Sequence, residues 1–395
     1  MRAASSSVYT LQFGLLCLSS LLFSASFNML IPELPAYLSS LGGTAYKGLI
    51  IALFTLTAGI SRPFSGKLTD TIGRVPVMAV GSIVCFICGF LYPVLGTVAG
   101  FLFLRLLHGF STGFKPTATA AYIADIIPAS RWGEALGIHG LCFSTGMAIG
   151  PAIGSAISAH YSVDILFYTS SFFALMSIVI LMNMKETVKN KQRFHPSLLR
   201  ISRYDIIDRN VLPAGIVTML NYFSYGVILT LIPDWSQHTG IVNKGLFFMV
   251  FTIASLLIRF IAGRISDRKG RIHVMIAGLA IVGLSLFILG YAHSIAGLIT
   301  GAVIYGIGSG ICSPAINAFT IDLSHPDHRG KAMATMYIAL EIGIGLGALI
   351  AGWLYQDVIA MIPVMFYVSG FTTLLALLYV YYWKQKNKQL PGTAA

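Results

Sequence analysis

The stretch GKLTDTIGRVPVM at residues 66–78 occurs a second time in the chain, as GRISDRKGRIHVM at residues 263–275. Four residue types recur at matching places: Gly66, Asp70, Gly73 and Arg74 match Gly263, Asp267, Gly270 and Arg271. The same offset of 197 residues (263 minus 66) also pairs Lys47 with Lys244, Gly146 with Gly343 and Gly150 with Gly347. One ungapped offset over this length indicates a chain built from two similar halves.

The composition is that of a membrane protein. Only 10% of the 395 residues are charged and 56% are hydrophobic, whereas soluble domains carry about 25% charged residues. Apolar segments of about 20 residues, enough to cross about 30 Å of hydrocarbon as helix, recur along the whole chain. We therefore predict an all-α integral membrane protein with twelve transmembrane helices. The predicted spans are 11–31, 46–66, 77–95, 98–120, 134–158, 164–184, 211–233, 245–264, 274–291, 295–320, 332–355 and 361–383.

The only long polar stretch, residues 185–209, separates the sixth span from the seventh. It predicts a linker between an N-terminal six-helix bundle, residues 1–184, and a C-terminal six-helix bundle, residues 210–395. An even number of spans per half gives both halves the same orientation, as in parallel repeats about an axis along the membrane normal. The first span resembles a cleavable signal peptide, but the repeat favours its retention in the bundle.

The formal net charge of +12 raises the possibility of nucleic-acid binding, but the basic residues are distributed as in a membrane protein. If both termini are cytoplasmic, only Lys47 and Lys244 fall on the outer side. Three more, Arg105, Lys115 and Arg259, lie within spans. The other 21 of the 26 Lys and Arg, with Arg62 counted among them, fall on the inner side. We therefore expect a multi-pass cell-membrane protein with both termini in the cytoplasm and no nucleic-acid partner.

Several polar residues lie within predicted spans, where a charge costs about 2.5–3.5 kcal/mol at the membrane centre. At 100° per residue, Arg105, His108, Thr112 and Lys115 share one face of the fourth span. Glu341, on the eleventh span, is the acid placed near mid-membrane. Two cations and one acid suggest a net positive cavity that suits an anionic or zwitterionic solute. The alternative is that the two cations bind backbone carbonyls and Glu341 merely neutralises one of them.

The seventh span places Thr218, Asn221, Tyr222 and Tyr225 on one face, where they can hydrogen-bond and stack on a solute or simply pack in a core. His108 is a candidate for proton relay or a satisfied buried histidine. The predicted solute-binding set is Arg105, Thr112, Lys115, Asn221, Tyr222, Tyr225 and Glu341.

Glycines on the fifth span, Gly146, Gly150 and Gly154, allow helix backbones to approach closely, and Pro151 permits a bend. A G-x-S-x-G pattern at residues 109–113 lies on a continuous helix, where a nucleophile elbow does not form. We therefore expect no enzymatic site, no metal and no cofactor.

These residues resemble the major facilitator superfamily, and within it the twelve-helix drug:proton antiporters and their sugar-efflux relatives. The stretch 66–78 is similar to the family's signature loop between the second and third helices. The resemblance implies that Asp70 and Arg74 make charge contacts that hold the outward-open state at the cytoplasmic side. Asp267 and Arg271 form an unusually complete second copy. Gly66 and Gly73 belong to the same gating loop.

RLLHG at residues 105–109 is similar to the family's fourth-helix motif, which implies that Arg105 takes part in proton coupling. GMAIGPAIG at residues 146–154 resembles the antiporter motif of the fifth helix, which favours export. Two features depart from the pattern: Ser155 replaces the usual closing glycine, and the first span lacks the mid-membrane acid found in many multidrug members.

The resulting hypothesis is rocker-switch antiport, in which inward proton flow drives a small organic solute or drug out of the cell. Glu341 carries the proton, and Arg105 or Lys115 modulates its pKa. His108 is a further proton-coupling candidate. The proton motive force is the energy source, and the partners are the solute, protons and the bilayer, with the protein a monomer. The alternatives are a proton symporter or facilitator for a sugar or organic anion, and a membrane receptor or enzyme that transports nothing.

Overall fold

The computed structural model describes residues 10–128, 131–200, 206–325 and 329–386, and in these ranges the chain forms helices without strands. The chain forms twelve α-helices of 18 to 29 residues, and a thirteenth, α2 (Leu34–Ser40), has 7 residues. Each predicted span corresponds to one long helix. The predicted all-α fold with twelve membrane-spanning helices is confirmed.

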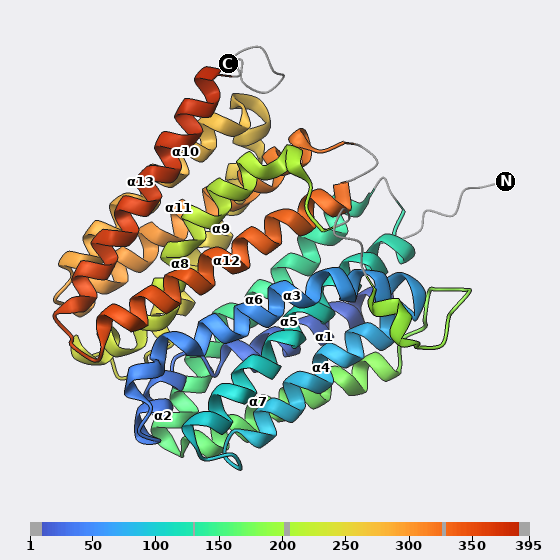
Figure 1. The fold of residues 1–395 in the computed structure, drawn as a ribbon, viewed down its shortest axis with the longest axis horizontal. Coiled ribbons are helices and arrows are strands. Elements are labelled where there is room, and N and C mark those ends of the chain that lie inside the picture. The colour runs from blue at the N-terminus through green and yellow to red at the C-terminus, as the bar shows by residue number, and fades with distance from the viewer. Residues whose placement is uncertain (1–9, 129–130, 201–205, 326–328, 387–395) are drawn as a thin grey trace.

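The N-terminal half consists of α1 (Leu11–Asn28), α2, α3 (Lys47–Thr71), α4 (Arg74–Leu91), α5 (Val98–Ile126), α6 (Trp132–His160) and α7 (Val163–Met182). The C-terminal half consists of α8 (Leu212–His238), α9 (Leu246–Lys269), α10 (Arg271–Tyr291), α11 (Ile295–Leu323), α12 (Arg329–Tyr355) and α13 (Met361–Lys386). Figure 1 shows them as two bundles, one blue to green and the other yellow to red.

Within the described residues, ten helical segments are long and apolar enough to cross a membrane, judged by length and composition alone. α5 is not among them, because Arg105, His108 and Lys115 lower the mean hydropathy of its apolar windows. The apolar part of α9 is short, Leu246–Arg259. The polar helix α5 is thus held in the bundle by its neighbours, and its charged residues must be satisfied inside the protein.

The two halves meet along two seams, α3 against α12 and α6 against α9. The offset of 197 residues places α9 at the position of α3 and α12 at the position of α6, so the seams are symmetry-related. Figure 1 shows α3 and α12 side by side between the bundles. An interface built from equivalent helices on both sides of the repeat axis is the geometry expected when one bundle rocks against the other.

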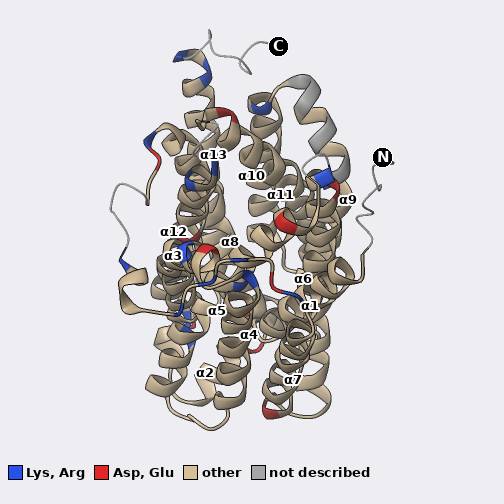
Figure 2. Cartoon of the chain, turned by 90° about the vertical axis from the view of Figure 1, so that its right-hand side faces the viewer, with Lys and Arg blue, Asp and Glu red and all other residues tan. Residues whose placement is uncertain are grey.

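The helices of both halves run between the same two ends of the molecule. The start of α1 and the end of α13 lie at the end of the molecule that carries the residue 185–200 part of the linker, hereafter the linker end. The turns 42–46 and 239–245 lie at the opposite end. Figure 2, turned so that the right-hand side of Figure 1 faces the viewer, shows mostly tan helices with a few blue and red segments among them.

The first part of the linker is bound to the N-terminal half. The Glu186 carboxylate accepts the backbone N–H groups of Arg74 and Val75, both at 3.0 Å, and so caps the start of α4. The N–H of Gln192 donates to the Thr71 carbonyl at 2.9 Å. Gly73 has φ +133°, and a Cβ there would collide with Glu186, so the turn requires glycine.

The predicted glycine contacts are present between α6 and α1. A Cβ on Gly146, Gly150 or Gly154 would meet α1 backbone oxygens, with Met29 O only 2.1 Å from the position on Gly154. Pro151 lies inside α6 between these glycines. The spacing of four residues keeps one glycine face against α1 over two turns, so the helix axes approach closely.

Candidate functional site

An ion pair joins the two halves near the middle of the helices. The Arg62 guanidinium, on α3, donates from Nη2 to Glu341 Oε1, on α12, at 2.7 Å. The side chains are 14% and 9% exposed. Glu341 lies about equally far from both ends of α12. Removing either partner of such a buried pair destabilises the protein, because the other charge is then left buried without a partner.

The ion pair borders a small cavity in the C-terminal half. The Arg62 guanidinium lies 4.8 Å from the centroid of the Tyr337 ring, a cation–π contact across the seam. Tyr337 also lines a cavity of about 60 Å³. The other lining residues are Thr218, Tyr222, Ser313, Ile316, Asn317, Met336 and Leu340. Hydroxyl, amide and aromatic groups therefore face the space beside the charged pair.

Among the residues that the structure describes, Nε of Arg62 on α3 and Oδ1 of Asn221 on α8 are buried without a hydrogen-bond partner. Buried polar atoms normally find a partner, so each is free to bind one that is not part of the chain. Tyr222 and Tyr225 lie edge to face with ring centroids 6.4 Å apart, and Tyr225 also packs against Phe251 at 5.9 Å. Of the predicted seventh-span residues, Thr218 and Tyr222 thus border the cavity.

Lys115 lies elsewhere, inside the N-terminal half, and is 1% exposed. Its ammonium donates to the carbonyl and hydroxyl of Ser19 at 3.0 and 2.9 Å, to the Ser82 hydroxyl at 3.1 Å, and to the Ser177 hydroxyl. These serines come from α1, α4 and α7, and the Phe23 ring lies 4.7 Å away. The ammonium therefore binds oxygens of its own half.

Arg105 and His108 also point into the N-terminal half. Arg105 donates from Nε to the Ile50 carbonyl at 2.9 Å and contacts the Tyr92 hydroxyl at 3.4 Å. His108 is hydrogen-bonded to the same hydroxyl at 3.1 Å through Nδ1 and to Cys85 at 3.2 Å through Nε2. The Thr112 hydroxyl donates back to Gly109 O of its own helix.

The sequence named Arg105 or Lys115 as the residue that modulates Glu341, and the structure places a different cation beside it. Neither Arg105 nor Lys115 pairs with it, and Arg62 does. The polar face of α5 is real, but its two cations bind carbonyls and hydroxyls within one bundle. The positive charge beside Glu341 therefore comes from Arg62 and not from the cations of α5. Arg62 had a detectable signal: it is a basic residue inside a predicted span, 46–66, although its charge was assigned to the inner side.

The signature loop forms a compact charge cluster in the N-terminal half. Arg74 donates to Asp70 at 2.6 Å and to Asp125 at 3.0 Å, and Glu186 adds the backbone contacts described above. Glu186 lies in the polar linker, where no sequence pattern marks it as a partner of this loop. In the second copy, Arg271 contacts Asp322 at 3.3 Å. The side chain of Asp267 lies outside the described residues. Gly66 has open space around its Cα.

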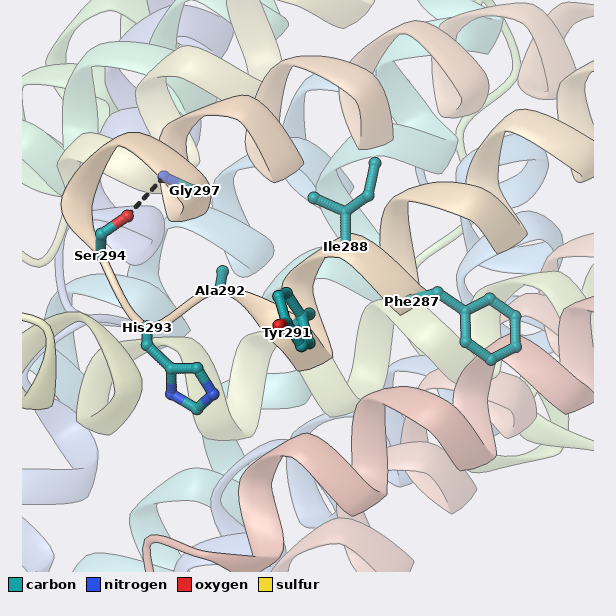
Figure 3. Close-up of a pocket in the computed structure, with 7 residues that line it drawn as sticks. All are labelled: Phe287, Ile288, Tyr291, Ala292, His293, Ser294 and Gly297. Atoms are coloured by element: carbon teal, nitrogen blue, oxygen red, sulfur yellow. Dashed lines mark hydrogen bonds between the residues drawn. The ribbon is translucent and has the colours of Figure 1, made fainter.

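A larger cavity of about 710 Å³ lies at the α10–α11 connection. Figure 3 shows its seven lining residues, Phe287, Ile288, Tyr291, Ala292, His293, Ser294 and Gly297. All belong to the C-terminal half, and Tyr291 is 79% exposed. A cavity on the outside of one bundle does not lie between the moving halves, so we assign the candidate site to the Arg62–Glu341 region.

Comparison with known proteins agrees with this architecture. The chain is 26% identical over 336 residues to an uncharacterized MFS-type transporter of Methanocaldococcus jannaschii, covering 83% of this chain and 86% of that one. It is 24% identical over 363 residues to multidrug resistance protein 1 of Bacillus subtilis, covering 90% and 92%. The crystal structure of a D-xylose–proton symporter superposes with a TM-score of 0.77 at 18% identity, covering 96% and 98%.

The family model of the Major Facilitator Superfamily matches residues 16–206 and 214–394, one match for each half. Together the two matches cover nearly the whole chain, including the paired signature loops, both seams and the central ion pair. This membrane protein of two pseudo-symmetric six-helix bundles belongs to the Major Facilitator Superfamily of transporters.

Proposed function

We propose that the protein exports a small organic solute in exchange for protons, and that Glu341 is the group over which solute and proton compete. The observation that carries the proposal is the Arg62–Glu341 ion pair, because it joins the two halves that alternating access must move. Similarity to a multidrug resistance protein supports an exported solute.

The pair gives Glu341 three mutually exclusive states. Its carboxylate is bound to Arg62, or protonated, or bound to a cationic group of a solute. Breaking a buried ion pair costs about 3–5 kcal/mol, which approaches the bias of about 5.5 kcal/mol that moves a two-state equilibrium from 1:99 to 99:1. Protonation of Glu341 therefore changes both the affinity for the solute and the contact between halves.

A second candidate function is proton-coupled symport of an organic anion, in which Arg62 and not Glu341 binds the solute. The guanidinium of Arg62 presents a planar set of N–H donors that suits a carboxylate or phosphate group. Its unpartnered Nε and the adjoining polar cavity offer an anionic group of the solute an alternative to Glu341. Glu341 would then take up a proton as the anion binds. Structural similarity to a proton symporter is compatible with this direction of coupling.

The sign of the coupling between proton and solute separates the two functions. In antiport, binding of a lipophilic cation to the purified protein in weak buffer releases protons. In symport, binding of an organic anion takes protons up. We expect proton release with the cation. Proton uptake with the anion, and no response to the cation, would establish the second function instead.

The role of Glu341 is tested by Glu341→Gln in proteoliposomes. We expect solute flux that no longer responds to an imposed pH gradient, because the amide can neither bind nor release a proton. Glu134→Gln is the matched control, since Glu134 pairs with Arg131 at 2.8 Å but both side chains are more than one-third exposed. An unchanged pH response in Glu341→Gln would exclude Glu341 as the exchange site.

A further inference from the structure

At the end opposite the linker, two lysines cross from one half to the other. Lys47, at the start of α3, donates to Asp234 of α8 at 2.7 Å and to Asp357 after α12. Lys244, just before α9, pairs with Glu33 at 3.1 Å. The offset of 197 residues places Lys244 at the position of Lys47. Equivalent lysines thus reach in opposite directions across the same interface.

Both lysines are withdrawn from water. The Lys47 side chain is 5% exposed and that of Asp234 is 12% exposed, whereas Lys244 and Glu33 are 14% and 10% exposed. Glu33 also accepts a hydrogen bond from Ser155 at 2.5 Å. Exposed ion pairs contribute little to stability, but pairs this buried hold their partners together because separation leaves charges without partners.

The backbones beside these lysines are in direct contact. A Cβ on Gly48 would lie 2.6 Å from the Ala348 carbonyl oxygen, and one on Gly245 would lie 2.0 Å from the Pro151 carbonyl oxygen. The same offset relates Gly48 to Gly245 and Pro151 to Ala348. Each lysine therefore stands beside a symmetry-equivalent contact between α3 and α12 or between α6 and α9. The halves are closed against each other at this end.

The Lys47 contact has two further features. Gln356 and Asp357 have φ of 42° and 64°, the left-handed region that side chains other than glycine rarely adopt. This turn aims Asp357 at Lys47, and strain of this kind persists only where surrounding contacts enforce it. Lys47, Asp234 and Asp357 also line a cavity of about 460 Å³. Breaking the contact would relax the turn and admit water from this end.

We propose that Lys47 and Lys244 are paired latches that close the transport pathway at the end opposite the linker, with Lys47 the stronger of the two. Lys47 contacts two carboxylates and Lys244 one, which gives the order of strength. Opening at this end requires both latches to separate, and closure at the linker end follows as the halves rotate. The proposal rests on alternating access between the halves and does not depend on proton coupling or on the solute.

Hydrogen–deuterium exchange of the full-length protein in lipid nanodiscs tests the latches. In Lys47→Met, we expect exchange in segments 42–48 and 239–246 to accelerate at least about tenfold, because a buried pair is lost. Exchange in segment 66–75 at the linker end should slow at the same time. Lys244→Met should show the same reciprocal pattern with a smaller amplitude.

Lys67→Met is the matched control, because Lys67 lies on the same helix and donates to the Arg200 carbonyl near the linker end. It should leave segments 42–48 and 239–246 unchanged. If Lys47→Met does not fold, Asp357→Asn removes one partner of Lys47 at a half-exposed site and should give the same pattern more weakly. Faster exchange near residue 47 without slower exchange at the linker end would mean local loosening and would overturn the latch assignment.

Restored pairing is the second test. The exchanged pair Lys244→Glu with Glu33→Lys, which involves one lysine and one carboxylate, should return exchange toward that of the unsubstituted protein, whereas either single change alone should not. Failure of the double variant to recover would show that the charges do not act as a pair. Because no solute is added, this outcome is independent of the result for Glu341.

Discussion

Lys115 is a buried ammonium whose partners are all oxygens of the N-terminal half. Four acceptors surround its three donated protons, and they come from Ser19, Ser82 and Ser177. These hydrogen bonds give the buried polar group partners inside the bundle, which a group removed from water requires. Its contribution is to connect α1, α4 and α7 through one side chain of α5.

We predict that Lys115→Met weakens the N-terminal half but leaves solute recognition intact. Loss of the ammonium leaves serine oxygens without a donor, which should lower the free energy of unfolding by about 1–3 kcal/mol. Thermal unfolding of the purified protein measures this effect. Solute KM in proteoliposomes should stay within about twofold, a free-energy difference well below 1 kcal/mol. A large rise in KM with unchanged stability would return Lys115 to the solute-binding set.

Glu341 and Arg62 show what single residues reveal before a structure is known. An acid in the middle of an apolar segment is costly, so the sequence alone marks Glu341 as a candidate site. Its partner depends on how α3 is placed against α12, and helix periodicity within one segment carries no information on that register. The polar face shared by Arg105 and Lys115 was likewise predicted from charges within an apolar segment. The sequence does not say whether that face points into its own bundle or toward the other half.

At the scale of helices, the glycines of α6 offer a comparison within one element. A Cβ on Gly154 would lie 2.1 Å from Met29 O, whereas nothing lies within 4 Å of the Cβ position on Gly137 or Gly140. The two kinds of glycine therefore differ in packing while sharing the same helix. Substitution by alanine should separate the packing effect from helix propensity.

We predict that Gly154→Ala lowers the free energy of unfolding by about 1–3 kcal/mol, because α1 must move away from α6. Gly137→Ala should instead be neutral or stabilise by up to about 1 kcal/mol through its better helix propensity. The midpoints of thermal unfolding in the same detergent measure both. Equal losses in the two variants would mean that close α1–α6 contact does not determine stability.

The helices themselves are well predicted from the sequence, because apolar length and short polar breaks set them directly. The spans missed mainly the ends: α5 runs to Ile126 and α3 to Thr71, beyond the apolar part of each segment. These polar final turns carry the helices past the apolar core toward the signature-loop cluster, where Arg74 meets Asp125 and Asp70. Hydropathy predicts only the apolar part of a helix, whereas the end of the helix depends on its capping contacts.

At the scale of the whole molecule, the repeat predicts two equivalent halves but not which end is closed. Symmetry-related lysines and glycines occur at one end, and signature loops occur at the other, so both ends carry contacts. A transporter must populate both arrangements, and their difference in free energy is only a few kcal/mol. The closed end opposite the linker depends on pairs such as Lys47 with Asp234, whose partners lie far apart in the chain.

The orientation of the molecule in the membrane is the last prediction. The linker end carries most of the 26 Lys and Arg, and such ends remain cytoplasmic during insertion. Val242, 81% exposed at the opposite end, and Phe194, 58% exposed in the linker, are suitable reporters. Val242→Cys should react with a membrane-impermeant maleimide in intact cells, and Phe194→Cys only after permeabilisation. The native cysteines give little background, since four are buried and Cys142 is partly buried. The reverse pattern of labelling would place the linker outside the cell and would make the latches at Lys47 and Lys244 a cytoplasmic gate.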